Sequence, residues 1–304
     1  MMRPLLPALA LLLATAAHAQ QQVNDPKFDA SVAKPTYTDK HPKVLFDEAH
    51  RNIHTTAGRY KPFATLITND GYQVTPNKDT FTSKTLQGYD ILVIANAGSA
   101  NMRAGNIESA FTRDECDAVY EWVQAGGSLL LIADHAPFGT TAERLSNRFG
   151  VDMSKGYTSD EANYAPGGNK GWLVFSRDNQ LLGDHPITNG RSDAEKLKRI
   201  VSFTGQSLQG PAGSVALLKL SDSAIDRLPP DMKKAVSAKG RAQGVALRCG
   251  KGRVVVMGEA AMLSAQVIRE QGKEPYNPHG MNFPGTDNRQ FVLNLMHWLS
   301  GLME

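Results

Sequence analysis

The stretch from Gly126 to Gly139 constrains the fold more than any other part of the chain. Two glycines introduce an apolar run that ends abruptly at Asp134 and His135. A continuous apolar run of this length between turn residues is typical of a strand buried on both faces. The stretch therefore predicts a central strand of an α/β sheet, with a carboxylate and an imidazole at its carboxyl end. In open α/β sheets, ligands bind at this edge.

Strand and helix patterns alternate around this stretch. Thr112, with Glu115 three residues later, forms a capping-box pattern for a helix that stops before Gly126. Apolar runs predict further strands at residues 43–46, 72–74 and 89–95, and apolar faces predict further helices at 60–69 and 141–149. The alternation predicts a mostly parallel sheet covered by helices on both faces. No domain linker interrupts it, so residues 43–303 are expected to form a single α/β domain.

The second half of the chain is less regular. Residues 154–171 are predicted to form a long loop, which in a compact domain is often functional, and residues 221–240 a polar surface excursion. Strands are expected at 200–203 and 215–220, a β-hairpin at 244–248 and 253–257, and a terminal amphipathic helix capped by Asp287.

Residues 1–19 are predicted to be a secretory signal peptide. Arg3 precedes an apolar stretch, and Ala17-His18-Ala19 supplies a cleavage-site pattern. The apolar stretch is shorter than the roughly 20 residues that a membrane span needs. The mature chain is therefore expected to be exported, to the periplasm or outside the cell, and to lack a transmembrane segment. Residues 20–42 are polar and proline-containing and are expected to form an N-terminal arm.

Composition and motifs exclude several functions. A net charge of +3, with acids and bases nearly balanced, argues against a nucleic-acid partner. No glycine-rich loop ends in Gly-Lys-Ser or Gly-Lys-Thr, as P-loop nucleotide hydrolysis requires, and no Gly-x-Ser-x-Gly elbow is present. Cys116 lies in a helical pattern and Cys249 at a strand end. Both are expected to remain free thiols, and neither is placed as a nucleophile.

Titratable side chains follow three of the predicted strands. Asp134 and His135 follow the central strand, and Glu259 follows the second arm of the hairpin. These three are the candidate catalytic residues, with His135 as general base and the two acids orienting it. The candidate ligand-binding residues follow two other strands and are Asp47, Glu48, His50, Asn52, His54 and Asn96. Parallel strands end at one edge, so all of these groups are expected to converge there.

A divalent metal ion is a further expectation for this edge, because imidazole and carboxylate groups suit zinc and similar ions. The ligands would be His135, His50, Asp134 and Glu259. The compact His-x-x-Glu-His and His-Glu-x-x-His spacings are absent. The alternative for each residue is a structural one, since polar side chains at strand ends often cap the next helix or bind a loop.

Several segments resemble the class I glutamine-amidotransferase-like superfamily, in particular its ThuA-like and DUF4350-type branch. They are residues 126–128 with 132–136, 184–190 (Asp-His-Pro-Ile-Thr-Asn-Gly), 45–52, 252–259 and 288–299. The resemblance covers residues 43–303 and implies a flavodoxin-like three-layer sandwich. Members that hydrolyse glutamine carry a cysteine nucleophile after a central strand. The matching strand end here carries Asp134-His135, so glutaminase activity is not expected.

The function expected from these observations is that of an exported amidotransferase-like domain. It would bind a polar small molecule such as a saccharide, the ligand class associated with ThuA-like proteins, and hydrolyse or otherwise transform it. The cluster of titratable groups favours this enzyme hypothesis. A non-catalytic ligand- or partner-binding module of the periplasm is the alternative, because the same loops can serve recognition alone.

Overall fold

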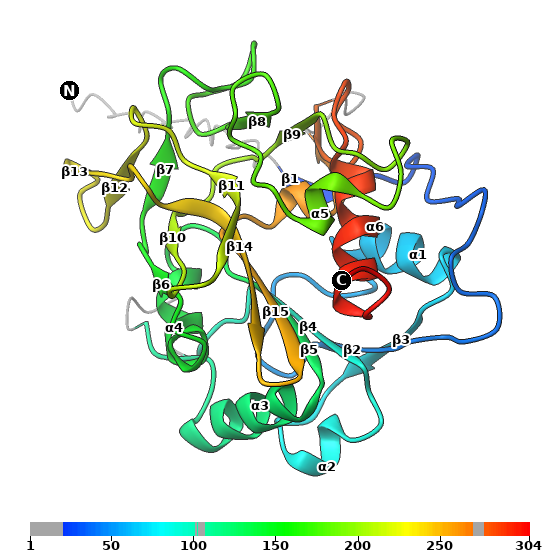
Figure 1. The fold of residues 1–304 in the computed structure, drawn as a ribbon. Helices are drawn as coiled ribbons and strands as arrows, with labels where there is room; N and C mark the ends of the chain where they lie inside the picture. Colours follow the sequence, from blue (N-terminus) through cyan, green and yellow to red (C-terminus); the bar gives the residue numbers. More distant parts are fainter. Residues whose placement is uncertain (1–20, 101, 103–106, 270–276) are drawn as a thin grey trace, which may run out of the picture.

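The computed structural model describes residues 21–100, 102, 107–269 and 277–304 (Figure 1). The predicted signal peptide at 1–19 lies outside the described residues. In the part of the chain that is described, no helix has the length and apolar character needed to cross a membrane.

A nine-stranded sheet organises the molecule. Its parallel part has the order β3-β2-β4-β5-β15, so β2, the first of these strands along the chain, lies between the second and the third. This is the strand order of flavodoxin-like folds, and the predicted fold class is confirmed. Antiparallel strands extend the sheet beyond β15. The strands are β3 (Gln73–Asn77), β2 (Lys43–Asp47), β4 (Ile91–Ala95), β5 (Ser128–Ile132), β15 (Gly252–Met257), β14 (Ala242–Cys249), β10 (Leu208–Gln209), β6 (Asp152–Met153) and β11 (Val215–Lys219).

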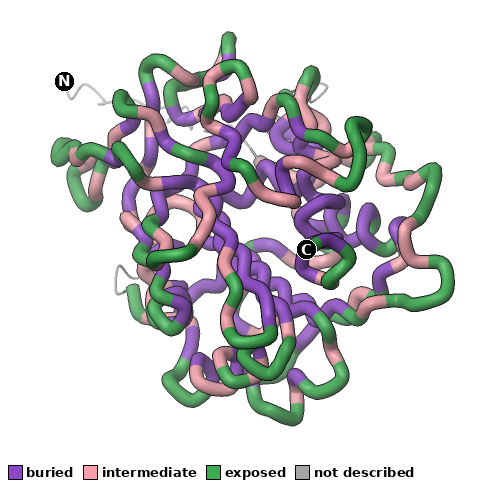
Figure 2. Tube along the Cα trace, in the orientation of Figure 1, coloured by how far each residue is buried: buried purple, intermediate pink, exposed green. Residues whose placement is uncertain are grey.

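Helices cover both faces of this sheet, which makes the domain three layers thick (Figure 1). Side chains alternate between the two layers: Leu130 of β5 packs in the cluster that includes α1 and α6, while Leu129 and Leu131 pack in the cluster that includes α3 and α4. Buried residues follow the central strands continuously (Figure 2). The helices are α1 (Lys61–Asn69), α2 (Ser83–Leu86), α3 (Arg113–Ala125), α4 (Phe138–Arg148), α5 (Pro186–Asn189) and α6 (Asn288–Leu299).

The elements with strong local patterns agree with their predictions. All five residues of β5 are buried, as the apolar run requires. At the start of α3, the Thr112 hydroxyl accepts from the backbone N–H of Glu115, and the Glu115 carboxylate accepts from the N–H of Thr112. The hairpin of β14 and β15 also forms. Each of these segments carries its full signal within about a dozen neighbouring residues.

Three peripheral segments differ from expectation. Residues 21–24 of the predicted arm form β1, which pairs with β16. Residues 225–237, predicted as an excursion, form the hairpin of β12 and β13, and β7 of the predicted loop pairs with β12.

Asp287 does not cap α6 through its side chain, because its Oδ2 accepts from the backbone N–H groups of Lys198 and Arg199. The remaining elements are β1 (Gln21–Asn24), β7 (Tyr157–Ser159), β8 (Val174–Ser176), β9 (Arg199–Val201), β12 (Ile225–Leu228), β13 (Lys234–Ser237), η2 (Ala261–Leu263), β16 (Ala265–Arg269) and β17 (Pro278–Gly280).

Candidate functional site

The acid pair, Asp134 and Glu259, lies where β5 and β15 end. These strands are parallel neighbours, and Ile132 pairs with Met257 at their last rung. Each acid follows its strand by two residues, so the two carboxyl groups emerge side by side at the carboxyl edge. The charge of Asp134 contributes to raising the pKa of Glu259. The structure thus brings together two of the three candidate catalytic residues at the edge expected for ligands.

Glu259 is the fully buried member of the pair. Its Oε1 accepts from the backbone N–H of Ala261 at 2.7 Å, and its Oε2 accepts from that of Met262 at 2.8 Å. Burial, followed by the charge of Asp134, raises the pKa of Glu259 to about 8, although the backbone hydrogen bonds act to lower it. A carboxyl group held in this way is protonated over much of the neutral range.

Asp134 is the member that keeps partial contact with solvent. Its Oδ1 accepts from the backbone N–H of His135 at 2.7 Å, and its own N–H donates to Oδ1 of Asn96 at 2.9 Å. Burial of its carboxyl group raises the pKa of Asp134 to about 7. With one acid near 7 and its neighbour near 8, the pair retains a proton at neutral pH, and the partly exposed Asp134 gives that proton a route to solvent.

The geometry of His135 fixes its tautomer. Ring atom Nδ1 lies 2.8 Å from the carbonyl oxygen of Ala136, and because a carbonyl only accepts, Nδ1 carries the proton. Burial lowers the pKa of His135, so the ring is neutral near pH 7 and Nε2 holds a lone pair. The ring stacks on Tyr157 with a centroid separation of 4.4 Å, which fixes its plane. His135 therefore presents a proton acceptor beside the acid pair.

Tyr60 and His54 form the inner wall beside the acid pair. Tyr60 is fully buried and donates from its hydroxyl to the carbonyl of Ala260 at 2.6 Å. Its partner Ala260 directly follows Glu259, and burial, followed by the charges of Glu259 and Asp134, raises the pKa of Tyr60. The His54 ring stacks on Tyr60 at 4.8 Å, and its Nδ1 is buried without a hydrogen-bond partner in the described structure. Burial lowers the pKa of His54 to about 3, so this ring is neutral.

Gln206 holds the loop that carries the site. Its Nε2 donates to the carbonyl oxygens of Ala133 at 2.8 Å and Asp134 at 2.9 Å, and its Oε1 accepts from the N–H of Lys155 at 2.8 Å. A Cβ added at Gly139 would lie 2.4 Å from Oε1 of Gln206, so the start of α4 has no room for a side chain there. One buried amide thus joins the end of β5 to the loop before β7.

His50 lies in a second cluster, built on β2 and α3. Its Nδ1 is 2.8 Å from Oδ1 of Asp47 and its Nε2 is 2.8 Å from Oε1 of Glu115. Carboxylates accept, so both ring nitrogens carry protons and the ring is a cation. Burial lowers the pKa of His50, but the bonds and charges of Asp47 and Glu115 outweigh it and the pKa is raised. The ring is packed between Phe81 and Phe111, at centroid distances of 4.7 and 4.8 Å.

The other predicted ligand-binding residues of this loop make contacts that hold the loop in its conformation. Asn52 donates to Oδ2 of Asp47 at 3.0 Å and accepts from the N–H of His50. Glu48 accepts from the N–H and the hydroxyl of Thr56 and pairs with Lys78 at 2.5 Å. The structural alternative, that polar groups at strand ends hold a loop, describes the contacts of Glu48, His50 and Asn52.

The expected metal ligands are not gathered in one place. Within residues 21–100, 102, 107–269 and 277–304, no group of three or more His, Cys, Asp or Glu side chains could hold a metal ion. The expectation that His50 joins the acid pair as a ligand is wrong, because β4 separates β2 from β5 and both nitrogens of His50 are occupied.

Both cysteines are free thiols, as predicted. Cys116 is buried in α3, where burial raises its pKa to about 11. Cys249 ends β14, which runs antiparallel to β15, so it lies at the opposite edge of the sheet from the acid pair. The full sequence contains only these two cysteines, and neither is placed beside Asp134 and Glu259.

Four residues of these two clusters are absent from the predicted site. Tyr157 lies in the 154–171 segment. The length of that predicted loop is the sequence feature that indicates a functional role. Tyr60 begins an apolar helix face, a pattern typical of core residues. Glu115 fits a capping box, but that pattern does not indicate that its other carboxylate oxygen contacts His50. Gln206 has no local pattern that identifies it.

No protein-family model matches this chain, and no curated protein matches it either. Several solved structures match it instead. The mmIFT52 N-terminal domain matches with a TM-score of 0.61 at 16% identity, over 85% of this chain and 97% of that one. The chain shares its fold with that domain. This likeness concerns the fold alone, because the identity is low.

Two further solved structures match with lower scores. A ThuA-like protein from Bacteroides uniformis has a TM-score of 0.43 at 14% identity, covering 87% of this chain and 94% of that one. A GMP synthase-type protein from Thermoplasma acidophilum has a TM-score of 0.44 at 12% identity, covering 87% and 97%. ThuA-like and amidotransferase-type proteins are thus among the structural neighbours, but at these scores the flavodoxin-like fold rests on the strand order itself.

Proposed function

We propose that this chain binds a polar small molecule of the saccharide class at the carboxyl edge of its sheet and hydrolyses it by acid–base chemistry. The observation that carries the proposal is the acid pair: two neighbouring carboxyl groups whose pKa values are raised to about 7 and about 8 beside a neutral imidazole. Groups poised in this range can both give and take protons at neutral pH.

The proposed roles follow from the protonation states. His135 Nε2 takes a proton from a water molecule as the water oxygen bonds to the glycosidic carbon of the substrate. The bond between that carbon and the leaving oxygen breaks, and the protonated acid of the pair donates its proton to that oxygen. The proton then passes from His135 back to the pair, which restores the starting state. Asn96 and Gln206 hold the loop in place through the backbone of Asp134. No thiol takes part, so we propose that glutaminase activity is absent.

The saccharide class is supported by two features. The edge offers carboxyl groups beside the stacked ring of Tyr157, a combination suited to hydroxyl-bearing rings. The resemblance of residues 132–136 and 184–190 to ThuA-like proteins points to the same class. The pattern of residues 1–19 supports action after export, in the periplasm or outside the cell.

A thermal-shift screen of the mature chain against mono- and disaccharides tests this proposal. We expect at least one saccharide to raise the Tm of the wild type and of His41→Ala, whose exposed ring lies near the amino end of β2. The same saccharide should leave His135→Ala unchanged. A shift of equal size in His135→Ala, or no shift with any saccharide, would contradict the proposal.

A non-catalytic binding module is the second candidate. It is favoured by the contacts of Glu259, whose two oxygens already accept from the backbone of η2 and so have a structural role. Mass spectrometry of the saccharide found in the screen separates the two candidates. Its conversion to a product by the wild type but not by Asp134→Asn supports the enzyme, whereas unaltered ligand with a retained thermal shift supports the binding module.

A further inference from the structure

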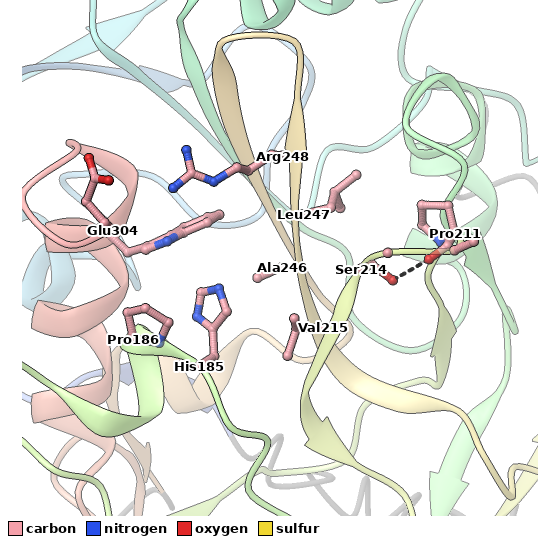
Figure 3. A pocket seen from close by; sticks show the side chains of 12 residues that line it. His185, Pro186, Pro211, Ser214, Val215, Ala246, Leu247, Arg248 and Glu304 are labelled. Carbon is pink, nitrogen blue, oxygen red and sulfur yellow. Dashed lines mark hydrogen bonds between the residues drawn. The ribbon is translucent and has the colours of Figure 1, made fainter.

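A cavity lies away from the acid pair. Its volume is about 410 Å³, within the range of small-molecule sites, and it opens between α5, the start of β11, β14 and α6 (Figure 3). Arg248 on its wall lies opposite Arg253 in the register of β14 and β15, at the beginning of β15. Glu259 follows the other end of β15. The cavity therefore sits toward the opposite edge of the sheet from the candidate active site.

His185, in the 184–190 motif, offers a hydrogen-bond donor to this cavity. Its Nδ1 accepts from the backbone N–H of Ile187 at 3.2 Å, which caps α5. A neutral ring that accepts at Nδ1 carries its proton at Nε2. Burial, followed by the charge of Arg248, lowers the pKa of His185 to about 4, so the neutral form holds at physiological pH. Figure 3 shows the ring directed from α5 into the cavity, toward β14.

Arg248 supplies an uncommitted positive charge. Its side chain is exposed and makes no hydrogen bond or ion pair with the part of the chain that the structure describes. Its strand neighbour Arg253 is occupied, since it donates to the carbonyls of Trp298 and Met303. Glu304 is the acid of the cavity lining, and within the described residues it forms no ion pair with Arg248.

The rest of the lining is mostly apolar. Pro186, Val215, Ala246 and Leu247 form its walls. The proton of the Ser214 hydroxyl is already donated to the carbonyl of Pro211 at 2.7 Å. The cavity thus has a guanidinium and an imidazole N–H on its lining, beside a mostly apolar surface.

We propose that this cavity binds a small organic anion. The anionic head pairs with Arg248 and accepts from Nε2 of His185, and an apolar ring lies against Val215, Ala246 and Leu247. A carboxylate and a phosphate share this head-group chemistry. The site is independent of the one proposed above, so either can fail without the other.

Calorimetry at low salt with benzoate and phenyl phosphate tests the site and distinguishes the two head groups. We expect one of them to bind the wild type, and Arg248→Gln to weaken that binding about tenfold or more. Lys251→Gln is the matched control, because it removes an exposed charge from the same hairpin outside the cavity. It should retain wild-type affinity, as should Asp134→Asn.

A second readout follows the His185 ring by NMR. Bound benzoate or phenyl phosphate should raise the pKa of His185, because a negative charge beside Nε2 favours the imidazolium. The proposal is overturned if neither anion binds, if benzamide binds as tightly as benzoate, or if inorganic phosphate alone binds as tightly as phenyl phosphate. Equal weakening by Lys251→Gln or by Asp134→Asn would also overturn it, since the anion would then lie elsewhere.

Discussion

Two clusters at the same edge of the sheet, the His50 cluster and the acid pair, differ in whether their carboxyl groups are paired with a cation. In the His50 cluster a cation lies between Asp47 and Glu115, and each nitrogen meets a carboxylate oxygen at 2.8 Å. In the acid pair, no cationic side chain of the described residues forms an ion pair with Asp134 or Glu259, and both pKa values are raised. The first arrangement satisfies its charges and holds the fold. The second stores a proton at a cost in stability, which is typical of sites that react.

The His50 cluster supplies the largest expected effect. His50→Ala leaves Asp47 and Glu115 buried without their cation, and we expect the free energy of unfolding to fall by about 3–5 kcal/mol. Urea denaturation near neutral pH measures this change, with His41→Ala as the control at an exposed histidine. A loss below about 1 kcal/mol would show that the cluster does not hold the fold, and the contrast with the acid pair would fail.

Asn96 connects the two clusters and supplies the next effect. Its Oδ1 accepts from the N–H of Asp134, its backbone carbonyl accepts from Ile53 in the His50 loop, and its φ of 49° lies in the left-handed region. Asn96→Ala removes the side-chain bond and strains the backbone, so we expect a loss of about 1–3 kcal/mol.

Asn96→Gly divides this loss into its two parts. Glycine adopts a positive φ without strain, so this variant should lose only the hydrogen bond to Asp134 and should be the more stable of the two. Urea denaturation of both variants side by side measures the difference. If glycine is no better than alanine, the left-handed backbone of Asn96 is not a source of the destabilisation.

The pH dependence of stability sharpens the contrast further. Because the folded-state pKa values of Asp134 and Glu259 lie above their unfolded values, the folded chain binds more protons between about pH 4 and about pH 8, and stability falls as the pH rises through that window. Asp134→Asn removes one acid and the repulsion on the other. We expect it to stabilise the chain by about 1–2 kcal/mol at pH 8 and to flatten the slope.

Denaturation midpoints of the wild type and Asp134→Asn across this pH range check the prediction. The raised pKa of His50 also makes stability fall as the pH rises, but that contribution is present in both proteins and cancels in their difference. A destabilised Asp134→Asn at pH 8, or parallel pH profiles, would mean that the acid pair does not store a proton.

Local sequence patterns predicted the scaffold well but not the division of the edge into two clusters. The apolar run before Asp134, the capping box at Thr112 and the β14–β15 hairpin each carry their signal within one continuous stretch of the chain. Which strand ends meet depends on strand order, and β4 lies between β2 and β5. Nothing in the sequence around His50 indicates that its partner is Glu115, 65 positions away.

The smallest effect concerns the stack that positions His135. The Tyr157 hydroxyl donates at 3.2 Å to the Ala136 carbonyl, which also accepts from Nδ1 of His135. Tyr157→Phe removes this hydroxyl and keeps the ring, so we expect a loss of about 0.5–1 kcal/mol and an unchanged tautomer by ¹⁵N NMR. Tyr164→Phe, at an exposed tyrosine, is the matched control.

Tyr157→Leu removes the ring as well and completes this test. Without the stacked surface the His135 ring is less buried, so its pKa should rise toward the ordinary value for histidine, which an NMR titration of the ring measures. A rise of equal size in Tyr157→Phe would assign the effect to the hydroxyl instead. In the His50 cluster the ring is held by two charges, and beside the acid pair the His135 ring is held by a neutral stack and one carbonyl. Only the second arrangement leaves a nitrogen free to accept a proton.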